Sequence, residues 1–342
     1  MKVGLVGYSG SGKSTVFTWL TGVVPDPAAS QRGQTGVSKI PDSRLTWLSE
    51  QFKPKKTTNA TLEVLDTPGL LVGDTKDNPR RLGILREADG LLVILNGFGG
   101  DPAKDLENFR ADCILADLEI VSNRIPKVEA QLKKAKPAKE READEAELAT
   151  LRKVVAVLES SKPLGQLELN EAEAKTIKAF QLLTLKPELA LVNQGDAGQS
   201  IPAKVLEMSP GALAAPVKLE QELVDLSEAD RTSFMNDLGM TELSKDKILR
   251  GIFYGMNRIV FLTAGEDECR TWAITKGVTA PLAAGAIHSD LTAGFVRAEV
   301  ISFEDYQKVG SFKEAKTKGV LRLEGKTYIV HDGDIMNILA NK

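Results

Sequence analysis

The chain has 342 residues, of which 42% are hydrophobic and 27% are charged, and this globular composition excludes a disordered or collagen-like chain. Its formal net charge of −3 argues against a wholly basic nucleic-acid-binding protein, so we expect no DNA partner. Two cysteines, Cys113 and Cys269, lie far apart, which excludes a disulfide framework and a cysteine-rich zinc site. No apolar run approaches the roughly 20 residues that span a bilayer, and the N-terminus lacks a signal-peptide pattern. We therefore expect a cytoplasmic protein with no membrane partner.

Apolar runs alternate with helical segments in the first part of the chain. Short apolar runs at 3–6, 61–65, 90–95 and 189–192 predict strands, and the segment 14–20 predicts a helix. The run at 90–95 has no charged residue, as is typical of a strand buried in a parallel sheet. Because strands separated by helices imply crossover connections, we predict an α/β fold with a doubly wound sheet.

A highly charged segment separates the third and fourth of these strands. Residues 116–175 hold 23 Asp, Glu, Lys and Arg in 60 positions. Apolar residues recur there at a spacing typical of helices that pack along a seam. We predict an antiparallel helical hairpin whose tip is in 133–147, where large apolar residues are almost absent. A solvated arm and a partner-binding face both fit this pattern, because balanced charge selects no partner.

The last part of the chain, 257–342, predicts a small α+β domain. Strands are predicted at 259–262, 295–300 and 328–330, with glycines between them. We expect a mixed or antiparallel sheet.

The sequence GYSGSGKS at 7–14 matches the phosphate-binding pattern GxxxxGK[ST] in full. It follows a predicted strand and opens a predicted helix, which is the context that this motif requires. Its glycines let successive backbone N–H groups converge on an anion, which the helix N-terminus also attracts. We predict that Lys13 reaches the β- and γ-phosphates and that the Ser14 hydroxyl ligates Mg²⁺. The residues predicted to bind nucleotide here are Gly7, Ser9, Gly10, Ser11, Gly12, Lys13, Ser14 and Thr15.

A second phosphate-sensing element is predicted in the sequence DTPG at 66–69, directly after a predicted strand. Ligands bind at that end of the strands in open α/β sheets. We expect Asp66 to hold Mg²⁺ and the Gly69 N–H to meet the γ-phosphate, so Lys13 and Gly69 are the predicted catalytic groups. The next residue is Leu70, where Ras-type GTPases use a glutamine to orient the attacking water. A leucine cannot hydrogen-bond that water, so we expect slow intrinsic hydrolysis.

Base recognition is predicted in the sequence NQGD at 193–196, which follows the strand at 189–192. In the guanine-reading pattern NKxD, the aspartate accepts hydrogen bonds from guanine N1–H and the exocyclic N2 amine. Asn193 and Asp196 match that pattern, whereas Gln194 replaces the lysine. Adenine would present an acceptor, N1, to the same carboxylate, so Asp196 favours guanine. A loop without this function is the alternative, because NxxD is a common pattern.

With these motifs, the chain resembles the Obg-like ATPase (YchF) family of translation-factor-related P-loop NTPases over nearly its full length. The resemblance extends to ADLE at 116–119 and, near the C-terminus, to EDECRTW at 266–272 and GFVRAEVI at 294–301. It implies a Ras-like NTPase domain with an inserted helical arm, followed by a ubiquitin-like TGS domain. The implied parts are 1–115 and 176–256 for the NTPase domain, 116–175 for the arm and 257–342 for the TGS domain.

The resemblance also implies association with ribosomes, with a possible rRNA contact. The family's preference for ATP is tied to a base motif that lacks the lysine and ends in glutamate. Gln194 agrees with that motif and Asp196 departs from it, so either ATP or GTP remains a candidate substrate. Thr35 and Ser30 are both candidates for the switch residue that closes on Mg²⁺.

We therefore expect Mg²⁺-dependent binding and slow hydrolysis of ATP or GTP, in a switch that acts on the ribosome in translation or stress. The alternative is a nucleotide-dependent binding module for ribosome or RNA with negligible hydrolysis.

Overall fold

The computed structural model describes residues 1–26, 29, 32–162 and 164–341. They form two compact units: a larger one of 2–36 and 63–244, and a smaller one of Met1, 37–62 and 245–342. The smaller unit thus combines residues 37–62 with the C-terminal part of the chain, which no sequence pattern indicates. The predicted domain boundaries stay a prediction. In the described part of the chain, no helix is both long and apolar enough to cross a membrane.

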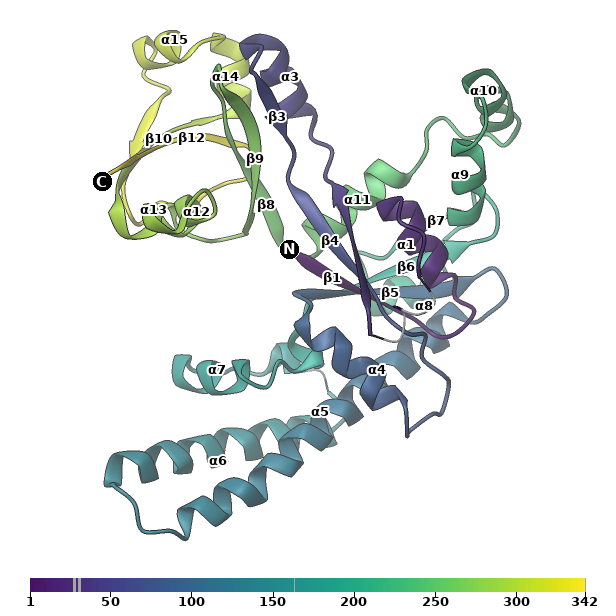
Figure 1. The fold of residues 1–342 in the computed structure, drawn as a ribbon, viewed down its shortest axis with the longest axis vertical. Helices are drawn as coiled ribbons and strands as arrows, with labels where there is room; N and C mark the ends of the chain where they lie inside the picture. The colour runs from purple at the N-terminus through teal and green to yellow at the C-terminus, as the bar shows by residue number, and fades with distance from the viewer. Residues whose placement is uncertain (27–28, 30–31, 163, 342) are drawn as a thin grey trace. The chain divides into compact units, whose positions relative to one another are not determined.

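The larger unit is built on a six-stranded sheet with the strand order β2-β4-β1-β5-β6-β7 (Figure 1). β1 pairs in parallel with β4 on one side and β5 on the other, and β6 pairs in parallel with β5 and β7. The doubly wound sheet and its four predicted strands are confirmed. Because the strand order reverses at β1, the carboxyl end of β1 is where ligands bind in such sheets. The strands are β1 (Lys2–Val6), β2 (Gln34–Lys39), β4 (Thr61–Asp66), β5 (Gly90–Gly97), β6 (Glu188–Gln194) and β7 (Leu213–Ala215).

One long helix, α5, connects the sheet to the helical arm. Its first half contributes Leu106, Phe109 and Cys113 to the core cluster that contains the β1 and β5 side chains. Its second half contributes Val121 and Val128 to the separate core of the arm. The helices of this unit are α1 (Lys13–Thr21), α4 (Asn78–Ile84), α5 (Pro102–Leu132), α6 (Ala138–Glu159), α7 (Glu171–Lys178), α8 (Ala203–Met208), α9 (Val217–Val224) and α10 (Glu228–Asp237), with short 3-10 turns at Leu85–Glu87, Leu164–Gln166 and Leu183–Leu185.

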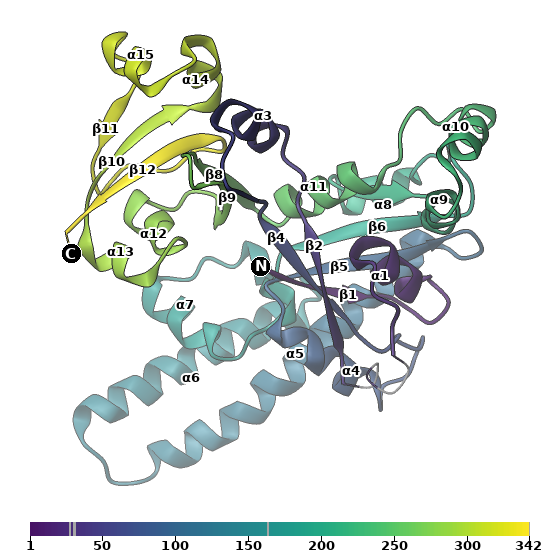
Figure 2. The same cartoon turned by 45° about the horizontal axis from the view of Figure 1, so that its top comes forward.

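The predicted helical hairpin is present, and α5 and α6 run side by side in it (Figure 2). Its tip is shorter than expected, because α6 begins at Ala138 and only residues 133–137 form the connection. The charged first turns of α6 are helical without large apolar residues, and exposed pairs such as Arg141–Glu145 support a helix. Two ion pairs join the helices, Arg124 with Glu147 at 2.7 Å and Arg152 with Glu129 at 2.8 Å.

The smaller unit has a mixed six-stranded sheet with the order β11-β10-β12-β8-β9-β3. One face packs on a cluster that includes alanines of α12, and the other face packs on a cluster that includes side chains of α3 and α14. The strands are β3 (Lys56–Thr58), β8 (Arg258–Thr263), β9 (Glu268–Thr275), β10 (Phe295–Ser302), β11 (Arg322–Glu324) and β12 (Asp334–Ala340). The helices are α3 (Ser43–Phe52), α11 (Lys245–Gly255), α12 (Ala280–Gly285), α13 (Ser289–Gly294), α14 (Phe303–Val309) and α15 (Phe312–Thr317).

The strand predicted at 328–330 is wrong. This segment makes only an isolated bridge, between Thr279 and Ile329, and the last strand is instead β12. A turn at Gly333, where φ is +84°, separates the two segments and lets β12 begin.

Candidate nucleotide-binding site

The phosphate loop connects β1 to α1 at the carboxyl edge of the larger unit's sheet (Figure 1). Gly10 and Gly12 have φ of +87° and +80°, a left-handed backbone that glycine adopts without steric cost. A side chain at Gly12 would also collide with Asn193 Nδ2. The Ser11 side chain is 1% exposed, and its hydroxyl has no hydrogen-bond partner among the described residues. The loop therefore has the curled backbone that its motif predicts.

The two motifs that are predicted to bind phosphate and metal meet in a buried ion pair. Lys13, the first residue of α1, contacts the carboxylate of Asp66, the last residue of β4, through Nζ and Oδ1. The two side chains are 8% and 2% exposed, and charges so deeply buried need a partner. The structure thus brings together the predicted phosphate-binding cation and the predicted metal ligand.

The segment after Asp66 is hydrogen-bonded to the phosphate loop. Leu70 N donates to Gly7 O at 3.0 Å, and Ser9 N donates to Leu70 O at 2.8 Å. Gly69 lies so close to the loop that a Cβ there would be 3.1 Å from Ser9 Oγ. The Leu70 side chain is 1% exposed and belongs to the core cluster under the sheet. Its orientation away from solvent explains why this position holds an apolar residue.

A polar network extends from the phosphate loop to α5. The Tyr8 hydroxyl donates to Asp112 Oδ2 at 2.9 Å, and Asn78 Nδ2 donates to the same oxygen at 3.2 Å. Asn78 also holds the Leu71 backbone, donating to its O at 2.8 Å and accepting from its N at 3.1 Å. Burial raises the pKa of Asp112. The pKa of Tyr8 is also raised, most by burial and next by the hydrogen bond to Asp112. Sequence analysis missed this network because its members come from three separate segments.

Of the residues in the predicted base-reading motif, two are buried and hydrogen-bonded to the backbone, and one is exposed. Asn193 Nδ2 donates to Ser11 O at 3.0 Å, and Gln194 Nε2 donates to Gln199 O at 2.6 Å. Both side chains are buried, so Asn193 supports the phosphate loop and Gln194 supports its own turn. Asp196 is exposed, which leaves its carboxylate open to a ligand.

Phe98, in the loop after β5, lies beside the candidate site, and the sequence analysis did not single it out. Its side chain is 51% exposed. A Cβ at Gly12 would lie 3.7 Å from its Cε1, and a Cβ at Gly195 would lie 3.2 Å from its Cβ. The ring therefore stands between the phosphate loop and the base-reading loop. An aromatic residue between glycines at a strand's carboxyl end is the signal that could have revealed it.

Asp117, in the ADLE motif of the resemblance, has a structural role. Its carboxylate, which is fully buried, accepts hydrogen bonds from Arg86 Nη1 at 2.8 Å, Leu183 N at 3.0 Å and Thr184 N at 2.8 Å. These contacts hold the chain where it returns from the arm. Of the two switch candidates, Thr35 is exposed on β2, and Ser30 lies outside the described residues.

The residues near the Lys13–Asp66 pair suit a magnesium ion. Ser14 is exposed and Thr15 is half-buried on the first turn of α1. The donor set is one hydroxyl, on Ser14, and one carboxylate, on Asp66. Mg²⁺ is usually bound by oxygen atoms, with one or two protein ligands and the rest from phosphates and water. This donor set therefore fits the ion together with a bound triphosphate.

Comparisons with known proteins identify the family. Residues 2–124 match the MMR_HSR1 family, described as a 50S ribosome-binding GTPase, and residues 259–341 match the YchF-GTPase_C family, described as a protein of unknown function (DUF933). The ribosome-binding ATPase YchF of Escherichia coli O157:H7 is 35% identical over 364 residues, which cover 99% of this chain and 99% of that protein. The chain belongs to the YchF family.

Other YchF proteins support the assignment. The ribosome-binding ATPase YchF of Bacillus subtilis strain 168 is 32% identical over 369 residues, which cover 100% of this chain and 99% of that protein. The solved structure of the Schizosaccharomyces pombe YchF GTPase superposes with a TM-score of 0.81 at 27% identity, covering 99% of this chain and 97% of that chain. The predicted family and its P-loop NTPase fold are therefore confirmed.

Proposed function

We propose that the chain binds a purine nucleoside triphosphate with Mg²⁺ at the phosphate loop and hydrolyses it slowly. The observation that carries the proposal is the buried contact between Lys13 and Asp66, because it joins both predicted motifs at the carboxyl edge of the sheet. The names of the YchF relatives, which include both ATPase and GTPase, support the same activity.

Each part of the site has a separate task in this proposal. Backbone N–H groups of the phosphate loop and the Lys13 ammonium bind the β- and γ-phosphates. Ser14 and Asp66 would hold Mg²⁺, which supplies positive charge against those phosphates when bound. The Gly69 N–H faces the γ-phosphate, whereas the buried Leu70 side chain orients no water. Hydrolysis is slow for that reason.

The base lies, in this proposal, against the exposed Phe98 ring, and its edge faces Asp196. Stacking on an aromatic ring is tolerant of the base, because every base has a π-face. Discrimination between ATP and GTP therefore depends on Asp196, whose carboxylate accepts from guanine N1–H and N2–H₂ but meets an acceptor on adenine.

We further propose that the chain binds the ribosome, with nucleotide state changing its affinity, and that it acts in the cytoplasm. The printed names of the YchF relatives, which describe them as ribosome-binding, support this partner. The network from Tyr8 to Asp112 supports a link between the phosphate loop and the arm, because Asp112 lies on the helix that continues into the arm.

The test is phosphate release from ATP and from GTP, with and without ribosomes, by the wild type and by Lys13→Ala. Ribosome-stimulated release is expected from the wild type, and background release from the variant, since the phosphates lose their buried cation. Lys104→Ala, which changes an exposed lysine of α5, is the matched control and should behave as the wild type. Equal background release in every case rejects the enzymatic part of the proposal.

The second candidate is a binding module in which nucleotide only orders the site. The burial of Leu70 favours it, because no side chain at that position can promote hydrolysis. Tight nucleotide binding in calorimetry, no turnover with ribosomes, and nucleotide-dependent ribosome affinity would together select this candidate.

A further inference from the structure

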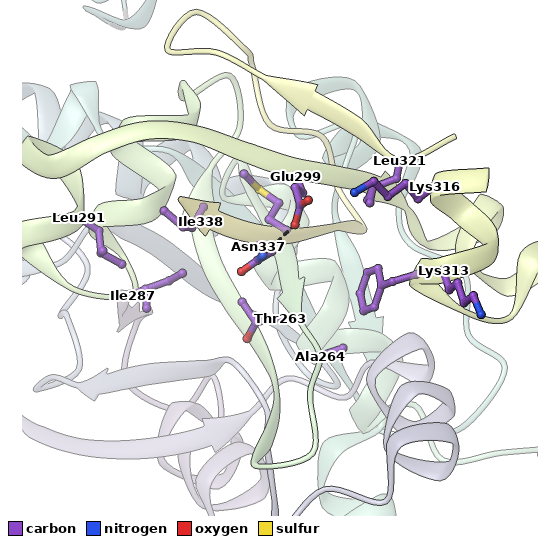
Figure 3. Close-up of a pocket in the computed structure, with 12 residues that line it drawn as sticks. Thr263, Ala264, Ile287, Leu291, Glu299, Lys313, Lys316, Leu321, Asn337 and Ile338 are labelled. Carbon is purple, nitrogen blue, oxygen red and sulfur yellow. Dashed lines mark hydrogen bonds between the residues drawn. The ribbon is translucent and has the colours of Figure 1, made fainter. Parts of the chain in front are cut away.

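A cavity of about 650 Å³ lies in the smaller unit, beside β12 (Figure 3). Its volume is within the range of binding pockets for small ligands. The candidate nucleotide site belongs to the larger unit, so this cavity has no role in the function proposed above.

The cavity is lined by residues that pack on both faces of the sheet. Ile338 of β12 and Leu291 line it, and both pack against the hydrophobic cluster on one face of the sheet. Phe312 and Leu321 also line it, and both pack against the cluster on the opposite face. A cavity whose lining includes members of both clusters reaches both faces of the sheet at the edge of β12. An extended segment placed there would direct alternate side chains to two faces, each already lined by apolar groups.

Part of the edge of β12 next to this cavity has no strand partner among the residues that the structure describes. β12 pairs with β10 along its whole length, from Ser302↔Asp334 to Phe295↔Ala340. On its other side it pairs with β8 only at Ile335↔Leu262. Residues 337–340 therefore have one edge that no described strand covers. Every second residue there directs its N–H and C=O toward the open side, and such an edge is a template for an added strand.

The charged side chains that line the cavity indicate which kind of peptide segment could bind along this edge. Lys313 and Lys316 of α15 line the cavity and are exposed, and neither has an ion pair among the residues that the structure describes. Glu299 is the acidic lining residue, and its carboxylate accepts a hydrogen bond from Asn337 Nδ2 at 2.9 Å. Figure 3 shows the two lysines toward one end of the cavity and Leu291 toward the other.

We propose that this cavity binds an extended, acidic-apolar peptide segment of a partner protein. The segment adds as a strand to residues 337–340 of β12. Its apolar side chains fill the space beside Leu291 and Ile338, and its carboxylates pair with Lys313 and Lys316.

The test uses a fluorescein-labelled peptide of sequence VDIEV, titrated with the full chain and followed by fluorescence anisotropy. Saturable binding is expected. The double variant Lys313→Glu, Lys316→Glu should weaken it by about tenfold, because two favourable charge pairs become repulsive. Lys326→Glu makes the same kind of change at an exposed lysine outside the lining and should leave the affinity unchanged. Hydrogen exchange should slow, when the peptide binds, at those amides of 337–340 that face the open side of β12, because the added strand protects them; the alternate amides already face β10.

Two control peptides separate strand addition from other binding. VDPEV lacks the central N–H and should bind at least about tenfold more weakly, and VKIKV should not bind. The proposal is overturned by no saturable binding of VDIEV up to about 1 mM, by equal binding of VDPEV, or by unchanged exchange at 337–340. Displacement of the peptide by an oligouridylate would also overturn it, because the lysines would then serve a nucleic acid.

Discussion

Replacing Leu70 with glutamine tests whether this position can take part in hydrolysis. In Ras-type GTPases the equivalent residue is a glutamine that orients the attacking water. Here the Leu70 side chain is 1% exposed and packs in the core with Tyr8 and Leu82. We therefore expect Leu70→Gln to leave phosphate release at the wild-type level, because the new amide would lie in the core.

The cost to stability can be worked out from that burial. Loss of a fully buried leucine removes about 1.5–3 kcal/mol of transfer free energy, and an unsatisfied buried amide adds about 1–3 kcal/mol. A total of about 3 kcal/mol is a conservative sum, and it corresponds to a fall in Tm of about 6–12 °C for a unit of this size. Leu71→Gln is the matched control, because Leu71 is 44% exposed and its replacement should change Tm little.

The measurements are calorimetric unfolding and phosphate release from ATP and GTP. A Leu70→Gln variant that keeps the wild-type Tm and hydrolyses nucleotide much faster would refute the reasoning. That result would mean that the side chain at this position turns toward the γ-phosphate.

Three further predictions concern other residues of the larger unit. Asp117→Ala should lower the free energy of unfolding by about 3–5 kcal/mol, because Arg86 loses its buried partner; chemical denaturation checks this, and a double variant with Arg86→Ala should cost less than the two single changes added. Phe98→Ala should weaken ATP and GTP binding equally, by about 1–3 kcal/mol in calorimetry, and an effect on one nucleotide alone would contradict stacking. Asp196→Ala should weaken GTP more than ATP, and Asp196→Glu should shift preference toward ATP. Indistinguishable affinities in the wild type and both variants would show that the base is read elsewhere.

Local patterns predicted the curled loop at 7–14 and the position of Asp66 because both depend on consecutive residues. The loop at 7–14 determines its own backbone, and Asp66 is placed by the strand that it ends. Phe98 and the Tyr8–Asp112 network come from segments that only the folded sheet brings together. No spacing in the sequence reports such contacts.

The smaller unit was less predictable for a related reason. β3, which comes early in the chain, pairs with β9 from Lys56↔Glu268 to Thr58↔Arg270, and pairing over more than 200 positions leaves no local signal. The polar Asn337 interrupts the apolar residues of β12, whereas the segment at 328–330 has the alternation of a strand. The sequence pattern therefore favoured the wrong segment.

Because α5 is one continuous helix, a change in its tilt beside the sheet would also move the arm. It has 31 residues, and at 1.5 Å per residue it is about 46 Å long. Asp112, where the phosphate loop holds it through Tyr8, is about 30 Å from the far end. A tilt of about 10° about that point would move the near end of the helix, about 15 Å away, by about 2.6 Å and the far end by about 5 Å, so a shift where α5 begins would be roughly doubled at the tip of the arm.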